Sequence, residues 1–340
     1  NESMAKKIFI GFVALVLVAF VLLFQFGGRA AEELTKKLLA EQTALQGTLK
    51  AEEIQANWSG DVIFKNVVWV GPDGKTIAEI PLATVSVNLF DALLKGGTGA
   101  SVGDVVIDKP SFFVSYNKKD GLNIVNYINF QVEEEQKNNE LLTVKKVASA
   151  TQFRGLMEIK DAKVNLLLEN KPLDFDKVQF QGNFKQYPKI KYGLRVKDGK
   201  SDIIADIQND SGTTAVVAEV KKMPLQNILN GLPQAADVVN TEGNLPGVKI
   251  RADKADDKWT LNIDGTIDGL KGSLINYPVT KGSGKFSADT EALKFAGLNL
   301  EVAGQTVIID GNVYYAEKPE AKQTYALTVN APSFVIEALS

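Results

Sequence analysis

Alternation of apolar and polar residues recurs along most of the chain beyond residue 50, and it constrains the fold more than any other sequence feature. Residues at every second position share one face of a β-strand, so such runs are typical of strands with one buried face. In one run Trp259, Leu261 and Ile263 alternate with polar residues. We count about 15 such runs but few segments with helical spacing, which excludes a doubly wound α/β fold. The sequence therefore predicts a mainly β protein.

Each predicted strand offers one apolar face, and the few helices cannot cover all of these faces. The faces must pack on one another in a sandwich or barrel, or line an open groove that another molecule occupies. Periodicity alone does not choose between these architectures. Glycines such as Gly269, Gly297 and Gly311 interrupt the runs and predict bulges where a sheet bends.

Three segments interrupt the strand pattern and divide the chain. Residues 30–50 have apolar residues at helical spacing and predict a juxtamembrane helix. Residues 131–150 are charged and poor in turn signals, and we interpret them as a loop. Residues 223–240 have one apolar stripe and predict a short helical insert. The strand-rich parts are then an N-terminal β region at 51–130 and a region of repeated strands at 151–340.

The segment from Ile8 to Phe26 is predicted to cross a membrane. Its about 19 residues would span roughly 28 Å as a helix, close to the hydrocarbon thickness of about 30 Å. Lys6 and Lys7 precede it, as expected for a cytoplasmic flank. A cleaved signal peptide is the alternative, but signal segments have shorter apolar runs. We therefore expect a single membrane anchor at residues 4–29, with apolar contacts to lipid from Ile8, Phe12, Leu15, Phe20, Leu23 and Phe26.

Composition excludes several classes of function. The chain has no Cys and no His, so it contains no disulfide, thiol nucleophile, Ser-His-Asp triad or His-ligated zinc site. The net charge is −3, and no basic stripe supports a nucleic-acid partner. We expect no enzymatic activity, no metal and no cofactor.

The order of short motifs in the N-terminal β region resembles a known family. A strand leads into Gly71-Pro72-Asp73-Gly74, a second strand precedes the Leu-rich segment 89–94, a third ends at Pro110, and Asp120-Gly121-Leu122-Asn123 follows. This order resembles the N-terminal region of AsmA-like and TamB-like envelope proteins. Segments 224–243 and 261–265 resemble the repeating β units of the same family.

The resemblance implies an elongated, curled antiparallel β-sheet that forms a groove, with a few short helices. It implies a protein anchored by a single pass in the bacterial inner membrane, with the bulk of the chain in the periplasm. The implied function is phospholipid transfer or lipid homeostasis between inner and outer membrane, without enzymatic chemistry. The alternative is a scaffold that assists outer-membrane protein assembly through β-strand interactions, with outer-membrane assembly proteins as partners.

In a lipid carrier, the apolar side chains on one face of each strand would contact the lipid. The competing interpretation is that these residues are ordinary core residues packed on protein. The residues expected to face lipid are Val85, Val87, Leu89, Trp259, Leu261, Ile263, Leu298, Leu300 and Val302.

Overall fold

The described residues form two compact units, Asn1–Tyr192 and Gly193–Ser340, called here the first and second unit. The computed structural model describes residues 36, 45–57, 60–87, 102–117, 121–127, 155–168, 171–186, 189–210, 213–227, 242–255, 258–274, 277–314 and 324–331. The boundary between the units falls after Tyr192, so segments on both sides of residues 131–150 belong to the first unit. Residues 131–150 themselves lie outside the described residues.

The mainly β fold predicted from the sequence is confirmed, with very little helix in the described part of the chain. No helix among the described residues is long and apolar enough to cross a membrane. The predicted anchor at 4–29 lies outside them, as do its residues Ile8, Phe12, Leu15, Phe20, Leu23 and Phe26.

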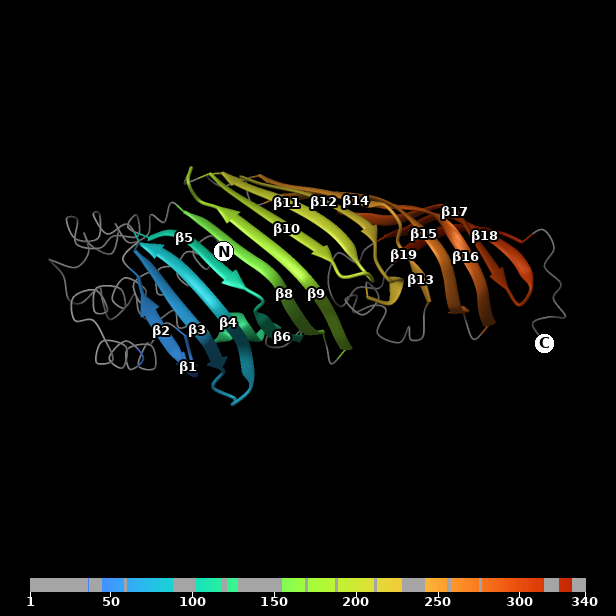
Figure 1. Ribbon diagram of the computed structural model, residues 1–340. Helices are drawn as coiled ribbons and strands as arrows, with labels where there is room; N and C mark the ends of the chain where they lie inside the picture. The colour runs from blue at the N-terminus through green and yellow to red at the C-terminus, as the bar shows by residue number, and fades with distance from the viewer. Residues whose placement is uncertain are drawn as a thin grey trace. The chain divides into compact units, whose positions relative to one another are not determined.

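The described strands of the first unit lie side by side in a sheet, with the short helix Asn123–Asn126 beside them (Figure 1). Its elements are β1 (Thr48–Lys50), β2 (Glu53–Ala56), β3 (Asp61–Val70), β4 (Thr76–Val87), β5 (Val102–Asp108), β6 (Ser111–Asn117), β7 (Gly121–Leu122), α4 (Asn123–Asn126), β8 (Leu156–Leu168) and β9 (Lys171–Asn183). The predicted turn after β3 is confirmed, because the amide of Gly74 donates to the carbonyl of Gly71 at 3.0 Å. Strand β4 then pairs antiparallel with β3.

The helix predicted over 30–50 is wrong at its C-terminal end. Lys36 is helical, but Thr48–Lys50 is a strand that pairs antiparallel with Val68–Val70 of β3. Gly47 precedes this strand with a φ of 92°, and a Cβ there would overlap the carbonyl oxygen of Val70. The chain turns at Gly47 because only glycine combines a positive φ with so close an approach of two backbones.

The predicted antiparallel sheet is confirmed only in part, because two of the described strand pairs are parallel. Strand β8 runs parallel to β5, where Met157 pairs with Val105. It also runs parallel to β6, where Leu168 pairs with Tyr116. Parallel neighbours need a connection of a dozen or more residues. The chain between β6 and β8 is long enough to provide that crossover, and strand periodicity does not reveal it.

Non-glycine residues with positive φ interrupt the strands of the first unit: Asn66 (48°), Lys109 (50°), Asp161 (50°) and Lys177 (54°). Lys109 and Asp161 fall at matching places, because the parallel register continues from Asp108–Lys160 to Ser111–Lys163. Each such bulge shifts the alternation by one residue. In β3, Val62 and Phe64 before Asn66 and Val67 and Trp69 after it are therefore all buried.

The second unit is a sheet in which the strand pairs are antiparallel. Strand β10 (Ile190–Lys197) crosses the boundary between the units. The others are β11 (Asp202–Asp210), β12 (Thr213–Lys222), β13 (Glu242–Asn244), β14 (Val248–Ala255), β15 (Lys258–Leu274), β16 (Tyr277–Ala288), β17 (Ala292–Val302), β18 (Gln305–Tyr314) and β19 (Thr324–Asn330). Of the helical insert predicted at 223–240, Leu225–Asn227 is helical and residues 228–240 lie outside the described residues.

Each unit has its own buried cluster. In the first unit Val62, Val85 and Val105 are completely buried on neighbouring strands β3, β4 and β5. In the second unit a smaller cluster joins β16, β17 and β18. It comprises Val279, Leu298, Leu300, Val302 and Val307.

Candidate functional site: an apolar sheet face

Strands β11, β12, β14 and β15 place apolar residues in rows across the second unit. In one row Ile207 faces Val216, which faces Ala252, which faces Leu261. Because alternate residues of a strand share a face, the next rows on the same side follow from the register. They contain Ala205, Ala218, Ile250 and Ile263, and then Ile203, Val220 and Val248. We call these eleven side chains the apolar face.

The opposite side of the same four strands is polar. Its rows contain Asp206, Val217, Arg251 and Asn262, and next to them Ile204, Glu219, Lys249 and Asp264. Apolar and polar residues are therefore separated between the two sides of one sheet. Val217, 57% exposed, and Ile204 are apolar exceptions among charged and amide neighbours.

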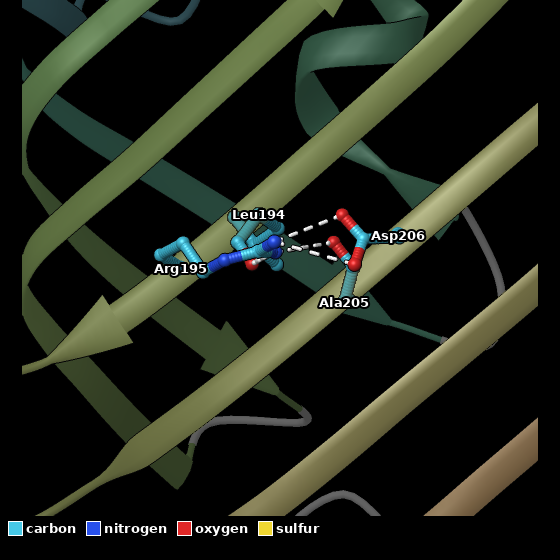
Figure 2. Close-up of polar contacts among 4 residues, drawn as sticks. All are labelled: Leu194, Arg195, Ala205 and Asp206. Carbon is cyan, nitrogen blue, oxygen red and sulfur yellow. Dashed lines mark hydrogen bonds and ion pairs between the residues drawn. The ribbon is translucent and has the colours of Figure 1, made fainter.

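An arginine fork holds the first strands of this sheet together on the polar side (Figure 2). Nη2 of Arg195 on β10 lies 3.0 and 3.2 Å from the two carboxylate oxygens of Asp206 on β11. Nη1 of Arg195 donates to the carbonyl oxygens of Leu194 at 2.8 Å and Ala205 at 3.1 Å. Both side chains are substantially exposed, so this pair contributes about 0.2–1 kcal/mol. The ion pair of Arg195 and Asp206 keeps both charged groups on the polar side of the sheet, away from the apolar face.

The apolar face is incompletely covered by the described elements. Ile207, Val216, Ile250, Leu261 and Ile263 are half-buried, whereas Val220 and Val248 at one end are buried. The main contacts of these strands with other described elements are with their neighbours within the sheet. Adjacent side chains on the same face therefore supply much of the burial, and part of the surface of these five side chains stays exposed.

A polar row limits the apolar face at the hairpin that joins β14 and β15. Asn209 faces Thr214, which faces Lys254, which faces Trp259. Trp259 is 49% exposed at this end of β15. An indole has an apolar ring and one N–H donor, so it suits a boundary between an apolar surface and water.

The structure places the predicted lipid-facing residues in three different surroundings. Trp259, Leu261 and Ile263 lie on one side of β15, with Leu261 and Ile263 in the apolar face. Val85 is completely buried in the core of the first unit. The remaining set is buried at 4–7% exposure in the cluster of β16–β18, so it packs as core: Leu298, Leu300 and Val302. Val87 ends β4, and its side chain and all of Leu89 lie outside what the structure describes.

Several residues of the apolar face were missed by sequence reasoning. Ile203 and Ile207 alternate with polar residues, but the adjacent Ile204 hides the period of two. Val216 belongs to an apolar run in which Val217 points to the opposite, polar side. Ile250 follows a turn in a short strand with several charges. Each strand contains its own apolar residues in the sequence, but only the pairing register of the strands shows that these residues form one surface.

The described groups with shifted pKa values lie at turns or, for Lys294, on the strand next to one. The pKa of Asp289 is lowered to about 2 by a hydrogen bond from Lys294 and by the backbone amides of Glu291 and Ala292. Burial, followed by the hydrogen bond to Asp73, raises the pKa of Tyr127. No group of acidic residues that could hold a metal ion is present among the described residues.

No protein-family model matches the sequence, and no curated protein matches it. The resemblance to AsmA-like and TamB-like proteins therefore stays a prediction.

Proposed function

We propose that the chain is a non-enzymatic protein of the bacterial envelope that binds phospholipid acyl chains on the apolar face and transfers them between membranes. The observation that supports this most directly is the apolar face itself, half-buried and separated from a polar reverse side. The proposed location is the inner membrane, with the two β units in the periplasm. The apolar segment Ile8–Phe26 and the motif resemblance support that location.

The dimensions and chemistry of the apolar face suit hydrocarbon. Four strands about 4.8 Å apart give a face roughly 15 Å across, and three residues per strand extend it to a similar length. Each CH₂ group that leaves water contributes about 0.8 kcal/mol, so a few contacts with an acyl chain suffice for binding. The face offers no charged side chain, so a lipid headgroup would remain at its polar boundary beside Lys254 and Trp259.

A photo-crosslinking experiment tests which side of the sheet meets lipid. The photoreactive residue p-benzoyl-phenylalanine replaces either Leu261 or Asn262 in the full chain, reconstituted in vesicles of phosphatidylethanolamine and phosphatidylglycerol. These adjacent positions lie on opposite sides of β15. We expect phospholipid adducts by mass spectrometry at position 261 and not at 262. Equal labelling at both positions, or none at 261, would overturn the proposal.

A transfer assay adds a functional readout. The full chain links donor vesicles, which carry a fluorescent phospholipid, to acceptor vesicles, and the rate of lipid mixing is measured. Ile263→Asp should lower the rate of protein-dependent transfer because it places a charge in the apolar face. Asn262→Asp introduces the same charge on the polar side and should leave the rate unchanged.

A further inference from the structure

The two Asp-Gly motifs of the N-terminal β region lie together in the first unit. Gly71-Pro72-Asp73-Gly74 forms the turn between β3 and β4, and Asn123, the last residue of the second motif, begins helix α4. The side chain of Asn123 accepts the backbone N–H of Ile124 at 2.8 Å. Helix α4 is only four residues long. Tyr127 directly follows it and donates a hydrogen bond from its hydroxyl group to the carboxylate of Asp73.

The ring of Tyr127 lies against the backbone of Gly71. A Cβ atom at Gly71 would be 2.9 Å from Cε2 of Tyr127 and 3.0 Å from Oδ1 of Asp73. A larger residue at position 71 would therefore displace the ring or the carboxylate. Oδ1 of Asp73 also accepts the backbone N–H of Lys75 at 3.1 Å, which holds the carboxylate in the turn. The turn between β3 and β4 therefore helps to place the side chain of Tyr127.

Tyr127 also contacts the chain that leads into β1. Its carbonyl oxygen accepts the backbone N–H of Gln46 at 2.6 Å. The carbonyl oxygen of Gln46 accepts the indole N–H of Trp69 at 3.0 Å. Leu45 and Tyr127 both pack against the buried cluster of the first unit. Other elements thus satisfy both backbone polar groups of Gln46, and Tyr127 supplies one of these contacts.

We propose that Tyr127 is a positioning residue that holds residues 45–47 on the sheet, and that loss of its hydroxyl group releases this segment while the sheet stays folded. We call Gln46, Asp73 and Tyr127 the junction. The pairing of β3 with β4 and of β4 with β5 involves none of these three residues. Gln46 and Gly47 have exposed side chains or backbone, and such a segment opens at a lower free energy than the whole domain.

The junction has a consequence for the proposed membrane protein. Residues 45–47 connect the proposed anchor at 4–29 to the first strand of the sheet. A fixed junction would therefore fix the direction in which the chain leaves the sheet towards the anchor. This consequence rests on the proposed function, whereas the junction itself does not.

Hydrogen exchange of the full chain in detergent tests the proposal. The variant is Tyr127→Phe, and the control is Tyr116→Phe, which changes an exposed residue of β6 in the same unit. We expect the amide of Gln46 to exchange about fivefold or more faster in Tyr127→Phe, and at the wild-type rate in Tyr116→Phe. Amides of β3 and β4 should keep their rates in both variants. An unchanged rate at Gln46 in Tyr127→Phe would overturn the proposal. An equal acceleration across β3 and β4 would also overturn it, because Tyr127 would then contribute only to overall stability.

A double-mutant cycle tests whether Tyr127 acts through Asp73. Asp73→Ala alone should accelerate exchange at Gln46 by a similar factor, and Tyr127→Phe added to it should accelerate exchange no further. Lys75→Ala removes a neighbouring, largely exposed charge but leaves both partners of the hydrogen bond, so it should leave the rate unchanged. If the effects of Asp73→Ala and Tyr127→Phe multiply, the hydroxyl group acts independently of the carboxylate and the proposed junction is wrong. Neither measurement involves lipid, so failure of the junction and failure of the proposed lipid transfer are distinguishable.

Discussion

Replacing Gly311 with Ala tests how closely β18 and β19 approach each other. Gly311 has a φ of 128°, a conformation that residues with a Cβ rarely adopt. A Cβ there would overlap the carbonyl oxygen of Ala326 and lie 2.9 Å from the Cα of Leu327. Both atoms belong to the backbone of β19, so no side-chain rotation relieves the overlap. Gly304 provides a matched control, because its φ is 77° and nothing lies near its Cβ position.

The expected magnitude follows from three contributions. The backbone conformation costs about 1–3 kcal/mol in an alanine. Moving β19 by about 1 Å stretches two neighbouring hydrogen bonds beyond about 3.5 Å, and each contributes about 0.5–1.5 kcal/mol. Alanine also lowers the conformational entropy of the unfolded chain, which raises the free energy of unfolding by about 0.4–1 kcal/mol. Gly311→Ala should therefore lower the free energy of unfolding by about 3 kcal/mol. In Gly304→Ala only the left-handed backbone conformation is unfavourable, so the free energy of unfolding should fall by about 1 kcal/mol or less.

Urea unfolding and hydrogen exchange together measure this difference. Urea unfolding followed by circular dichroism gives the free energy of unfolding of each variant. Hydrogen exchange locates the change, and we expect amides of residues 324–330 to lose protection in Gly311→Ala but not in Gly304→Ala. If the two variants lose the same free energy and exchange alike, Gly311 does not hold the close approach, and the register of β19 on β18 is wrong.

Two further predictions concern the core and one turn. Val85→Ala removes a completely buried side chain and should lower the free energy of unfolding by about 1.5–3 kcal/mol in urea, whereas Val217→Ala, 57% exposed, should change it by less than about 0.5. The pKa of Asp289 is lowered to about 2 from 3.8, so the stability that its carboxylate supplies is present above about pH 4 and lost as the pH falls towards 2. In Lys294→Ala an NMR titration of the Asp289 carboxyl should show its pKa rising towards 3.8, and an unchanged pKa would mean that the backbone amides alone lower it.

Alternation predicted the strands well because it reports a local property, the separation of apolar and polar residues along an extended chain. The run of Trp259, Leu261 and Ile263, predicted to alternate along a strand, lies in β15, Lys258–Leu274. The pattern could not predict which strands are neighbours. The parallel pairing of β8 depends on a crossover between β6 and β8, and no residue type within β8 encodes its direction.

Bulges were predicted only where glycine marks them. Gly297 interrupts β17, and the register shifts between Phe295 and Leu298 as expected. Lys109, Asp161 and Lys177 also have positive φ, but nothing in the sequence distinguishes them from ordinary strand residues. Alternation counted through such positions assigns the residues that follow them to the wrong face.

For the candidate site, the sequence could not show which apolar strand faces are buried and which are exposed. Trp259, Leu261 and Ile263 have the same alternation as Leu298, Leu300 and Val302, and the sequence treats the two sets alike. The structure separates them by exposure. The second set packs with Val279 and Val307, whereas in the first set Leu261 and Ile263 are half-buried and Trp259 is 49% exposed. Whether a face is core or surface depends on what lies over it, and that is a tertiary property.

Both units use bulges to keep apolar residues on one side of long strands. In β3 the bulge at Asn66 keeps Val67 and Trp69 on the side of Phe64, and in β17 the bulge near Gly297 keeps Leu298 on the side of Phe295. Without these shifts, strands of ten or more residues would present apolar residues first on one side and then on the other. A surface for acyl chains requires this one-sidedness but no particular apolar side chain, since hydrocarbon burial is non-directional. Exchanges among Ile, Val and Leu on the apolar face should therefore preserve the proposed lipid binding, whereas deletion of a single bulge residue would move every apolar residue beyond it to the opposite side of the sheet.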